Sequence, residues 1–322
     1  MSTILVTGSS GFIWFHTSKA LLAQWHTVIG VDIENSYYDV TLKQARRESL
    51  LQHANFVFFP YDIADTATME HCFQNAKIDV IINLAAQAWV RYSIENPSSY
   101  IVSNIVWFHT LLQLAVKYGA KNVVYASTGS VYGSYADGTL KGTVTDCCEA
   151  PLSLYAATKK CDELIAHSYS AMFGLQTIGL RFYNVVGARG RPDAAYFIFT
   201  KHILENNPIK IHNFGKMKRN NTAVEDIVAG IVAAVEYDNG GRYEIFNLGN
   251  ERQVDIMHFI EHLEKTLGKE AQKEYVAMGP GEIDISSVDS SETTRILWRQ
   301  PNVSVEQALE NFVERYRWFY TI

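Results

Sequence analysis

The 322-residue sequence has no excess of basic residues, no long apolar segment and no CxxC pair of cysteines. It carries 28 Lys and Arg against 34 Asp and Glu, a net charge of −6. Without a basic field, nucleic acid is not expected as a partner. Polar residues interrupt every apolar run well before the ~20 residues that span a bilayer, so we expect no membrane partner either.

Residues 1–20 have no basic segment and no cleavage site, and we therefore expect no signal peptide. The cysteines are Cys72, Cys147, Cys148 and Cys161, and none of them forms a CxxC pair. The number and spacing of these cysteines predict free thiols in a cytoplasmic protein and no metal site. The sequence shows no repeat and no low-complexity segment.

The first half of the sequence alternates short apolar strands with amphipathic helices. Strands are predicted at Thr3–Thr7, Thr27–Asp32, Asn55–Pro60, Val80–Leu84, Asn122–Ser127 and Gln176–Arg181. Helices are predicted near Thr17–Gln24, Ala67–Ala76, Tyr100–Tyr118 and Tyr155–Phe173. This order predicts an α/β fold with a doubly wound parallel sheet of the Rossmann type.

After Arg181 the alternation becomes irregular. We expect a helix at Val224–Tyr237, a strand at Tyr243–Leu248 and a last helix at Ser304–Phe319. The economical interpretation has two domains. Residues 1–184 and about 224–250 form a dinucleotide-binding domain, and about 185–223 and 251–322 form a smaller α/β domain for the substrate.

The run from Thr3 to Ile13 resembles the start of a dinucleotide-binding unit, because a strand enters a glycine turn and a helix follows. Bare backbone at Gly8 and Gly11 lets a pyrophosphate approach the helix N-terminus. Asp32, at the end of the second strand, can accept hydrogen bonds from the adenosine ribose and would repel a 2′-phosphate. The predicted cofactor is therefore NAD rather than NADP. Asp62 and Ile63 follow the third strand and could hold adenine.

A second motif, Tyr155-x-x-x-Lys159, places a phenol and an ammonium on one helix face. A neighbouring ammonium favours the phenolate, which suits a general base. The preceding strand ends in hydroxyl residues, of which Thr128 or Ser130 could bond the same reacting oxygen. We predict Thr128, Tyr155 and Lys159 as the catalytic residues.

The stretches TGSSGFI, NLAAQA, STGSVYG, YAATKK and RFYNVVG resemble the extended short-chain dehydrogenase/reductases of the nucleotide-sugar epimerase type. The runs YYDV, GRPD and GKMKR resemble the UDP-glucuronate 4-epimerases in particular. The resemblance covers nearly the whole chain. It implies a homodimer, and cofactor-binding residues at Gly8, Gly11, Phe12, Ile13, Asp32, Asp62, Ile63, Leu84, Ala85, Ala86, Gln87, Asn104, Tyr155 and Lys159.

The resemblance also implies a redox-neutral isomerase acting on a UDP-sugar. UDP-glucuronate would become UDP-galacturonate through a 4-keto intermediate, a step of polysaccharide biosynthesis. The implied substrate-binding residues are the arginine of Arg91-Tyr92, Ser130, Asn184, Arg191 and Arg219. Asn184 stands where glucuronate epimerases often have Thr and is more typical of neutral-sugar epimerases. A decarboxylase or dehydratase is disfavoured, because such relatives carry an acidic residue where this chain has Gly129-Ser130.

Five of the six tryptophans, at positions 14, 25, 89, 107 and 298, fall where the family pattern has glycine. Trp14 takes the place of a small residue at which helix and strand pack closely, and overpacking of this kind typically costs ~1–3 kcal/mol. Trp25 lies between a helix and a strand at a position that favours positive φ. These replacements make a poorly active relative the third hypothesis.

Overall fold

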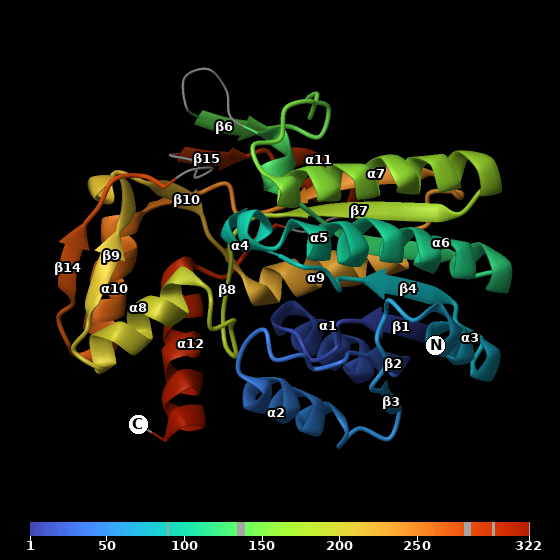
Figure 1. Cartoon of the computed structure of the whole chain (residues 1–322), viewed down its shortest axis with the longest axis horizontal. Coiled ribbons are helices and arrows are strands. Elements are labelled where there is room, and N and C mark those ends of the chain that lie inside the picture. Colours follow the sequence, from blue (N-terminus) through green and yellow to red (C-terminus); the bar gives the residue numbers. More distant parts are fainter. Residues whose placement is uncertain (89, 134–138, 280–284, 298–299, 322) are drawn as a thin grey trace.

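A parallel seven-stranded sheet forms the centre of the computed structural model, which describes residues 1–88, 90–133, 139–279, 285–297 and 300–321 (Figure 1). The strand order is β12-β7-β5-β4-β1-β2-β3. The bounds are β1 Thr3–Thr7, β2 Thr27–Val31, β3 Phe56–Phe59, β4 Val80–Asn83, β5 Asn122–Thr128, β7 Gln176–Phe182 and β12 Tyr243–Leu248. All six neighbouring strand pairs are parallel.

Helices cover both faces of this sheet. On one face pack α1 (Phe12–Ala23) and α9 (Val224–Glu236), and on the other α3 (Thr66–Asn75), α6 (Trp107–Tyr118) and α7 (Leu154–Phe173). Side chains of β1 alternate between the two cores: Ile4 and Val6 join the α1/α9 side, and Leu5 the α6/α7 side. The predicted doubly wound α/β fold is confirmed.

Helices α1 and α2 differ from the sequence-based expectation. Helix α1 begins at Phe12, five residues before the predicted start, because Gly11 serves as its N-cap. Helix α2 (Val40–Leu50) was not anticipated. Its buried face includes Lys43 and Arg46 as well as leucines, so apolar periodicity does not reveal it.

A smaller region with its own core lies beside the sheet, on the left of Figure 1. Phe197, Phe259, Leu263 and Phe312 are buried in this core. Its elements are α8 (Ala195–Leu204), β9 (Pro208–Ile211), β10 (Lys218–Asn220), β13 (Gln253–Asp255), α10 (Ile256–Leu267), β14 (Gln272–Tyr275), β15 (Ile285–Val288) and α12 (Val305–Tyr320).

Short elements connect the two regions and border the ends of the central strands. They are α4 (Val90–Glu95), α5 (Pro97–Tyr100), a π-helix at Ile101–Val106, 3₁₀ turns at Gly129–Tyr132 and His212–Gly215, β6 (Thr139–Gly142), β8 (Val185–Val186), β11 (Thr222–Ala223) and α11 (Ser291–Leu297). Strand β6 pairs with β15, and β8 pairs with β11.

One helical stretch of the described chain, Pro97–Tyr118, is long and apolar enough to cross a membrane, with a mean hydropathy of 1.3. Its inner face nevertheless belongs to the sheet core, where Trp107, Phe108, Leu111 and Leu112 are buried. A core helix of a folded domain has the same composition, so this stretch is weak evidence for a membrane span.

Candidate functional site

The strand order reverses between β1 and β4, and the loops that leave these two strands touch. A Cβ atom added to Gly8 would lie 3.1 Å from the Cα of Ala85. Gly8 has φ +77° and donates its N–H to Val31 O at 2.7 Å, which ties the turn to β2. Gly11 is the N-cap of helix α1, and no side chain caps the first N–H groups of the helix. In doubly wound sheets this switch point is where ligands bind, and such free N–H groups attract anions.

The carboxylate of Asp32 lies at the end of β2 beside this turn. Its Oδ2 accepts from Ser10 N at 3.0 Å, and its Oδ1 accepts from Glu34 N at 2.7 Å. The position suits the ribose-binding role predicted for it. Farther along the same edge, Asp62 is exposed and accepts from Ala64 N at 2.8 Å, while Ile63 packs against the core.

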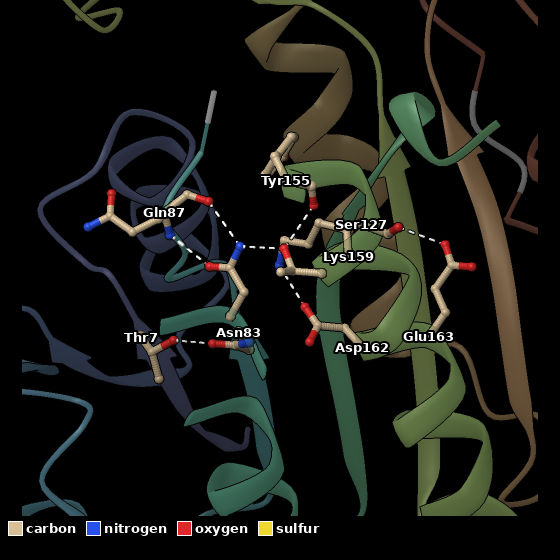
Figure 2. Close-up of polar contacts among 10 residues, drawn as sticks. Thr7, Asn83, Gln87, Ser127, Tyr155, Lys159, Asp162 and Glu163 are labelled. Atoms are coloured by element: carbon tan, nitrogen blue, oxygen red, sulfur yellow. Dashed lines mark hydrogen bonds and ion pairs between the residues drawn. The ribbon is translucent and has the colours of Figure 1, made fainter. Parts of the chain in front are cut away.

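Lys159 and Asp162 form a buried ion pair on α7 (Figure 2). Lys159 Nζ donates to Asp162 Oδ2 at 3.0 Å, and both side chains are almost fully buried. Burial raises the pKa of Asp162 from 3.8 to about 6, while the Lys159 ammonium acts in the opposite direction. Tyr155 lies one turn earlier on the same helix, and its ring meets that of Tyr100 edge-on at 6.2 Å.

Asn104 links the loop after β4 to the start of α7. Its Oδ1 accepts from Gln87 N at 2.9 Å, and its Nδ2 donates to Gln87 O at 3.1 Å and to Thr158 Oγ1 at 2.9 Å. Thr158 in turn donates to the backbone oxygen of Tyr155 at 2.8 Å. Asn104 belongs to the π-helix, a local widening that is frequent at functional sites.

The hydroxyl groups of Thr128 and Ser130 lie together where β5 ends. Thr128 Oγ1 donates to Ser130 Oγ at 3.3 Å and accepts from Ser130 N at 3.2 Å. Between them, Gly129 is covered by the ring of Tyr183, because an added Cβ would lie 2.6 Å from Tyr183 Cζ. Position 129 therefore has no room for a side chain in this arrangement.

The predicted substrate residues lie at the border between the sheet and the smaller region. Arg191 makes a two-pronged ion pair with Asp193, at 3.0 Å from Nε and 2.6 Å from Nη2. Arg219 on β10 donates to Lys218 O, and Asn184 is exposed. The side chain of Arg91 lies outside the described residues.

Tyr92, the neighbour of Arg91, is described. Its ring centroid lies 5.0 Å from that of Tyr37. Burial raises the pKa of Tyr37 to about 12, and the Asp193 carboxylate adds to this effect.

Near Asp32 and near Lys159, the hydrogen-bonding groups of the site suit a dinucleotide. At the glycine turn, the Trp14 side chain does not suit one. A Cβ on Gly11 would lie 2.6 Å from Trp14 Cδ1, and one on Gly8 would lie 3.2 Å from Trp14 Cε2. The indole thus packs against the glycine turn inside the core, at the place where a small residue normally lets the helix and the strand pack closely. Trp14 is only 5% exposed, so it is held there by packing.

Sequence reasoning missed Asp162 and Thr158 as parts of this site. Asp162 could have been found from its spacing, since it lies three residues after Lys159 and therefore on the same helix face. Thr158 gives no such signal, because its role depends on the distant Asn104. Within the described ranges, no three His, Cys, Asp or Glu side chains gather to hold a metal ion.

The Rossmann-type sheet with this site is typical of one class of enzymes, and the chain belongs to it: residues 4–249 match the NAD dependent epimerase/dehydratase family. Among its relatives, a UDP-glucuronate 4-epimerase from Thermodesulfobacterium geofontis is 38% identical over 314 residues, 97% of this chain and 95% of the relative.

Two solved structures illustrate the likeness. UDP-glucuronic acid 4-epimerase from Bacillus cereus, in complex with UDP-glucuronic acid and NAD, gives a TM-score of 0.91 at 33% identity, covering 99% of this chain and 100% of that chain. UDP-glucose 4-epimerase from Thermotoga maritima, with UDP-glucose, gives 0.87 at 30% identity, with 99% of each chain covered.

Proposed function

We propose that this protein is an NAD-dependent 4-epimerase of a UDP-sugar that converts UDP-glucuronate into UDP-galacturonate. The observation that carries the proposal is the Tyr155/Lys159 pair beside the switch point, in a chain 38% identical to a UDP-glucuronate 4-epimerase. A tyrosine base and a dinucleotide-type turn together suit the removal and return of a hydride at a carbinol carbon.

Residues from several loops would hold the dinucleotide. Asp32 would accept hydrogen bonds from the adenosine ribose, and the pyrophosphate would lie among Gly8, Gly11, Phe12 and Ile13. The residues for the other parts of the cofactor are Asp62, Ile63, Leu84, Ala85, Ala86, Gln87, Asn104, Tyr155 and Lys159. When bound, NAD supplies a nicotinamide that takes a hydride from C4 of the sugar and gives it back.

The proton chemistry belongs to this chain. The Tyr155 phenolate takes the proton of the sugar 4-hydroxyl, and Thr128 orients that hydroxyl. Lys159, four residues after Tyr155 on α7, would bind the nicotinamide ribose. The 4-keto sugar then rotates in the site so that the opposite face of C4 would receive the hydride, and Tyr155 returns the proton to the 4-oxygen. No net oxidation results.

Arg191 and Arg219 would bind the acidic groups of the substrate. A planar guanidinium pairs two oxygens of a carboxylate or a diphosphate at once, as Arg191 already does with Asp193. The arginine of Arg91-Tyr92 and Ser130 complete the proposed substrate set. Asn184 supports a second candidate, a neutral UDP-sugar, because the resemblance has Asn at this position in neutral-sugar epimerases and often Thr in glucuronate epimerases.

A decarboxylase or 4,6-dehydratase is the less favoured alternative. Such enzymes would need a carboxylic acid near the 4-keto intermediate, and the sequence has Gly129 and Ser130 at that place. The ring of Tyr183 covers Gly129, so even a small side chain there would displace it.

We also propose a cytoplasmic homodimer with two domains, residues 1–184 and about 224–250 for NAD, and about 185–223 and 251–322 for the nucleotide sugar. Apolar side chains on the outer surface of the π-helix and α7 support the dimer. Ile101, Val102, Val106 and Leu164 are between 41% and 60% exposed.

An assay of sugar products tests the proposal. Purified protein is incubated with NAD and either UDP-glucuronate or UDP-glucose, and products are separated by chromatography. We expect UDP-galacturonate from the first substrate at higher kcat/KM than UDP-galactose from the second. Release of CO2 would instead establish the decarboxylase, and a preference for UDP-glucose would establish the neutral-sugar epimerase.

A further inference from the structure

Three tryptophans of the described chain, Trp14, Trp25 and Trp107, occupy places where the backbone or the packing calls for glycine. A different feature disfavours tryptophan at each: the backbone conformation at Trp25, the crowded glycine turn at Trp14 and an unpaired indole N–H at Trp107. The exception is Trp318, which has an ordinary environment. Trp89 and Trp298 lie outside the described residues.

Trp25 ends α1 in a left-handed conformation, with φ +65°. Trp25 N donates to Leu22 O at 3.1 Å, and the next residue, His26, donates to Leu21 O at 3.2 Å. These two bonds define the Schellman motif, whose left-handed residue is usually glycine. A bulky side chain at this φ is a conformational outlier.

The same chain ends two other helices with the same pair of bonds, and both use glycine. Gly119 closes α6 with φ +71°, and Gly268 closes α10 with φ +67°. A Cβ on either would meet nothing within 4 Å, so neither glycine is required by crowding. Glycine is there for its backbone freedom, and Trp25 stands in the same motif without that freedom.

Trp14 presses on the turn that starts α1. Its Cδ1 lies 2.6 Å from the ideal Cβ position of Gly11, closer than real Cβ contacts come. Only the bare backbone of Gly11 allows the indole to lie there. A side chain at position 11 and the indole of Trp14 would therefore need the same space.

Trp107 is buried at the junction of the π-helix and α6, with 1% of its surface exposed. Its indole Nε1 has no hydrogen-bond partner among the described residues. Buried indole N–H groups usually find an acceptor, and leaving one unpaired costs free energy. Trp318 contrasts with these three: it lies on α12, is 63% exposed, and its ring holds the guanidinium of Arg315 at 4.4 Å.

We infer that the working form of this protein carries glycine at positions 14, 25, 89, 107 and 298, and tryptophan only at 318. One rule accounts for all five positions. The codon UGA is read as tryptophan in one variant genetic code and as glycine in another, whereas UGG is tryptophan in both. Five UGA codons and one UGG codon would give this pattern, with no need for five independent mutations.

The inference has a direct structural consequence. Glycine at 14 clears the face of Gly11, and glycine at 25 relaxes the left-handed end of α1. Glycine at 107 removes a buried, unpaired donor. Only the first consequence rests on the proposed dinucleotide site, since the other two concern the fold alone.

Peptide mass spectrometry of the protein isolated from its own cells tests the inference directly. We expect glycine at all five positions, tryptophan at 318, and UGA codons at those five places in the gene. Tryptophan at any of the five, in the isolated protein, would overturn the rule. This readout needs no activity, so an inactive protein with five glycines would contradict the proposed function and leave this inference standing.

A second measurement uses two recombinant variants, Trp25→Gly and Trp318→Gly. Both remove one indole from an exposed position, but only the first sits in a left-handed backbone conformation. We expect Trp25→Gly to raise Tm by ~2 °C or more and Trp318→Gly to leave it unchanged or lower it. A Trp25→Gly chain that melts no higher than the original would contradict the argument from the Schellman motif.

Discussion

The ammonium of Lys159 lies 3.0 Å from the carboxylate of Asp162, and hardly any of either side chain is exposed. One Asp162 oxygen, Oδ1, has no hydrogen-bond partner among the described residues. A proposed catalytic lysine is thus neutralised by a partner on its own helix. Asp162 therefore fixes where the Lys159 ammonium lies on the helix face that also carries Tyr155.

The first prediction concerns the pH dependence of stability through Asp162. Its folded-state pKa is raised from 3.8 to about 6, chiefly by burial. Protonated Asp162 therefore stabilises the folded state in full below pH 3.8, and this contribution to the free energy of unfolding is lost as pH rises through about 6. Relative to Asp162→Asn, the original chain should lose stability over this interval, as measured by urea unfolding at a series of pH values.

Glu292→Gln is the control for this prediction. Glu292 pairs with Arg295 at the same helical spacing, but the pair is exposed. The difference in stability between Glu292→Gln and the original chain should change little with pH over the same interval, because solvent screens exposed ion pairs. A constant difference in stability between the original chain and Asp162→Asn from pH 4 to pH 7 would contradict the account of Asp162.

The second prediction concerns the base. Tyr155→Phe keeps the ring that packs edge-on against Tyr100 and removes only the hydroxyl. We expect an unchanged thermal transition and a loss of ~10²–10⁴-fold in kcat. The matched control is Tyr92→Phe, whose hydroxyl accepts a hydrogen bond from the exposed Asn96 Nδ2 at 3.2 Å and should be dispensable. Equal kcat for Tyr155→Phe and the original chain would rule out Tyr155 as the base.

The third prediction concerns cofactor affinity. Trp14→Gly frees the face of Gly11 and should tighten NAD binding ~5- to 150-fold, if the ~1–3 kcal/mol released by relief of overpacking goes to binding. Isothermal titration calorimetry measures the Kd directly. Trp318→Gly, far from the glycine turn in sequence and located on α12, should leave the Kd unchanged. If Trp14→Gly binds NAD no better, the indole does not obstruct the site.

The fourth prediction concerns the proposed dimer. Val106 is 54% exposed and Leu164 is 60% exposed, on the surface formed by the π-helix and α7. Glutamate at both positions should convert a dimer into a monomer, as followed by light scattering after gel filtration. Leu51→Glu introduces the same charge at a residue that is 49% exposed just after α2 and should preserve the dimer. A monomeric original chain would dismiss the dimer altogether.

Much of the sheet could be predicted from sequence because its strands are buried on both faces. Such strands form nearly continuous apolar runs, and β1, Thr3–Thr7, was predicted to the residue. The left-handed conformation expected at Trp25 is confirmed. Helix α2 could not be predicted, because Lys43 and Arg46 supply much of its buried face. Lys43 donates to Asn35 O just before the helix, and Arg46 donates to Arg189 O in a distant loop.

The site was predictable only as far as its local motifs extend. Gly8, Gly11, Tyr155 and Lys159 belong to short runs whose spacing carries the chemistry. Asn104 bonds to Gln87 and Thr158, which lie 17 and 54 positions away in the sequence. Only the folded chain brings these residues together. Asp162 was overlooked because an acidic residue near a lysine on a helix is usually a solvated pair.

The central claim, redox-neutral epimerisation at C4, is tested most directly by proton NMR of UDP-glucuronate incubated with the protein and NAD. The chain is assayed both as it stands and with glycine at positions 14, 25, 89, 107 and 298. The account predicts that UDP-galacturonate appears and approaches a constant ratio to UDP-glucuronate, with no accumulation of NADH. Unchanged UDP-glucuronate with both chains, or NADH rising in proportion to product, would contradict it.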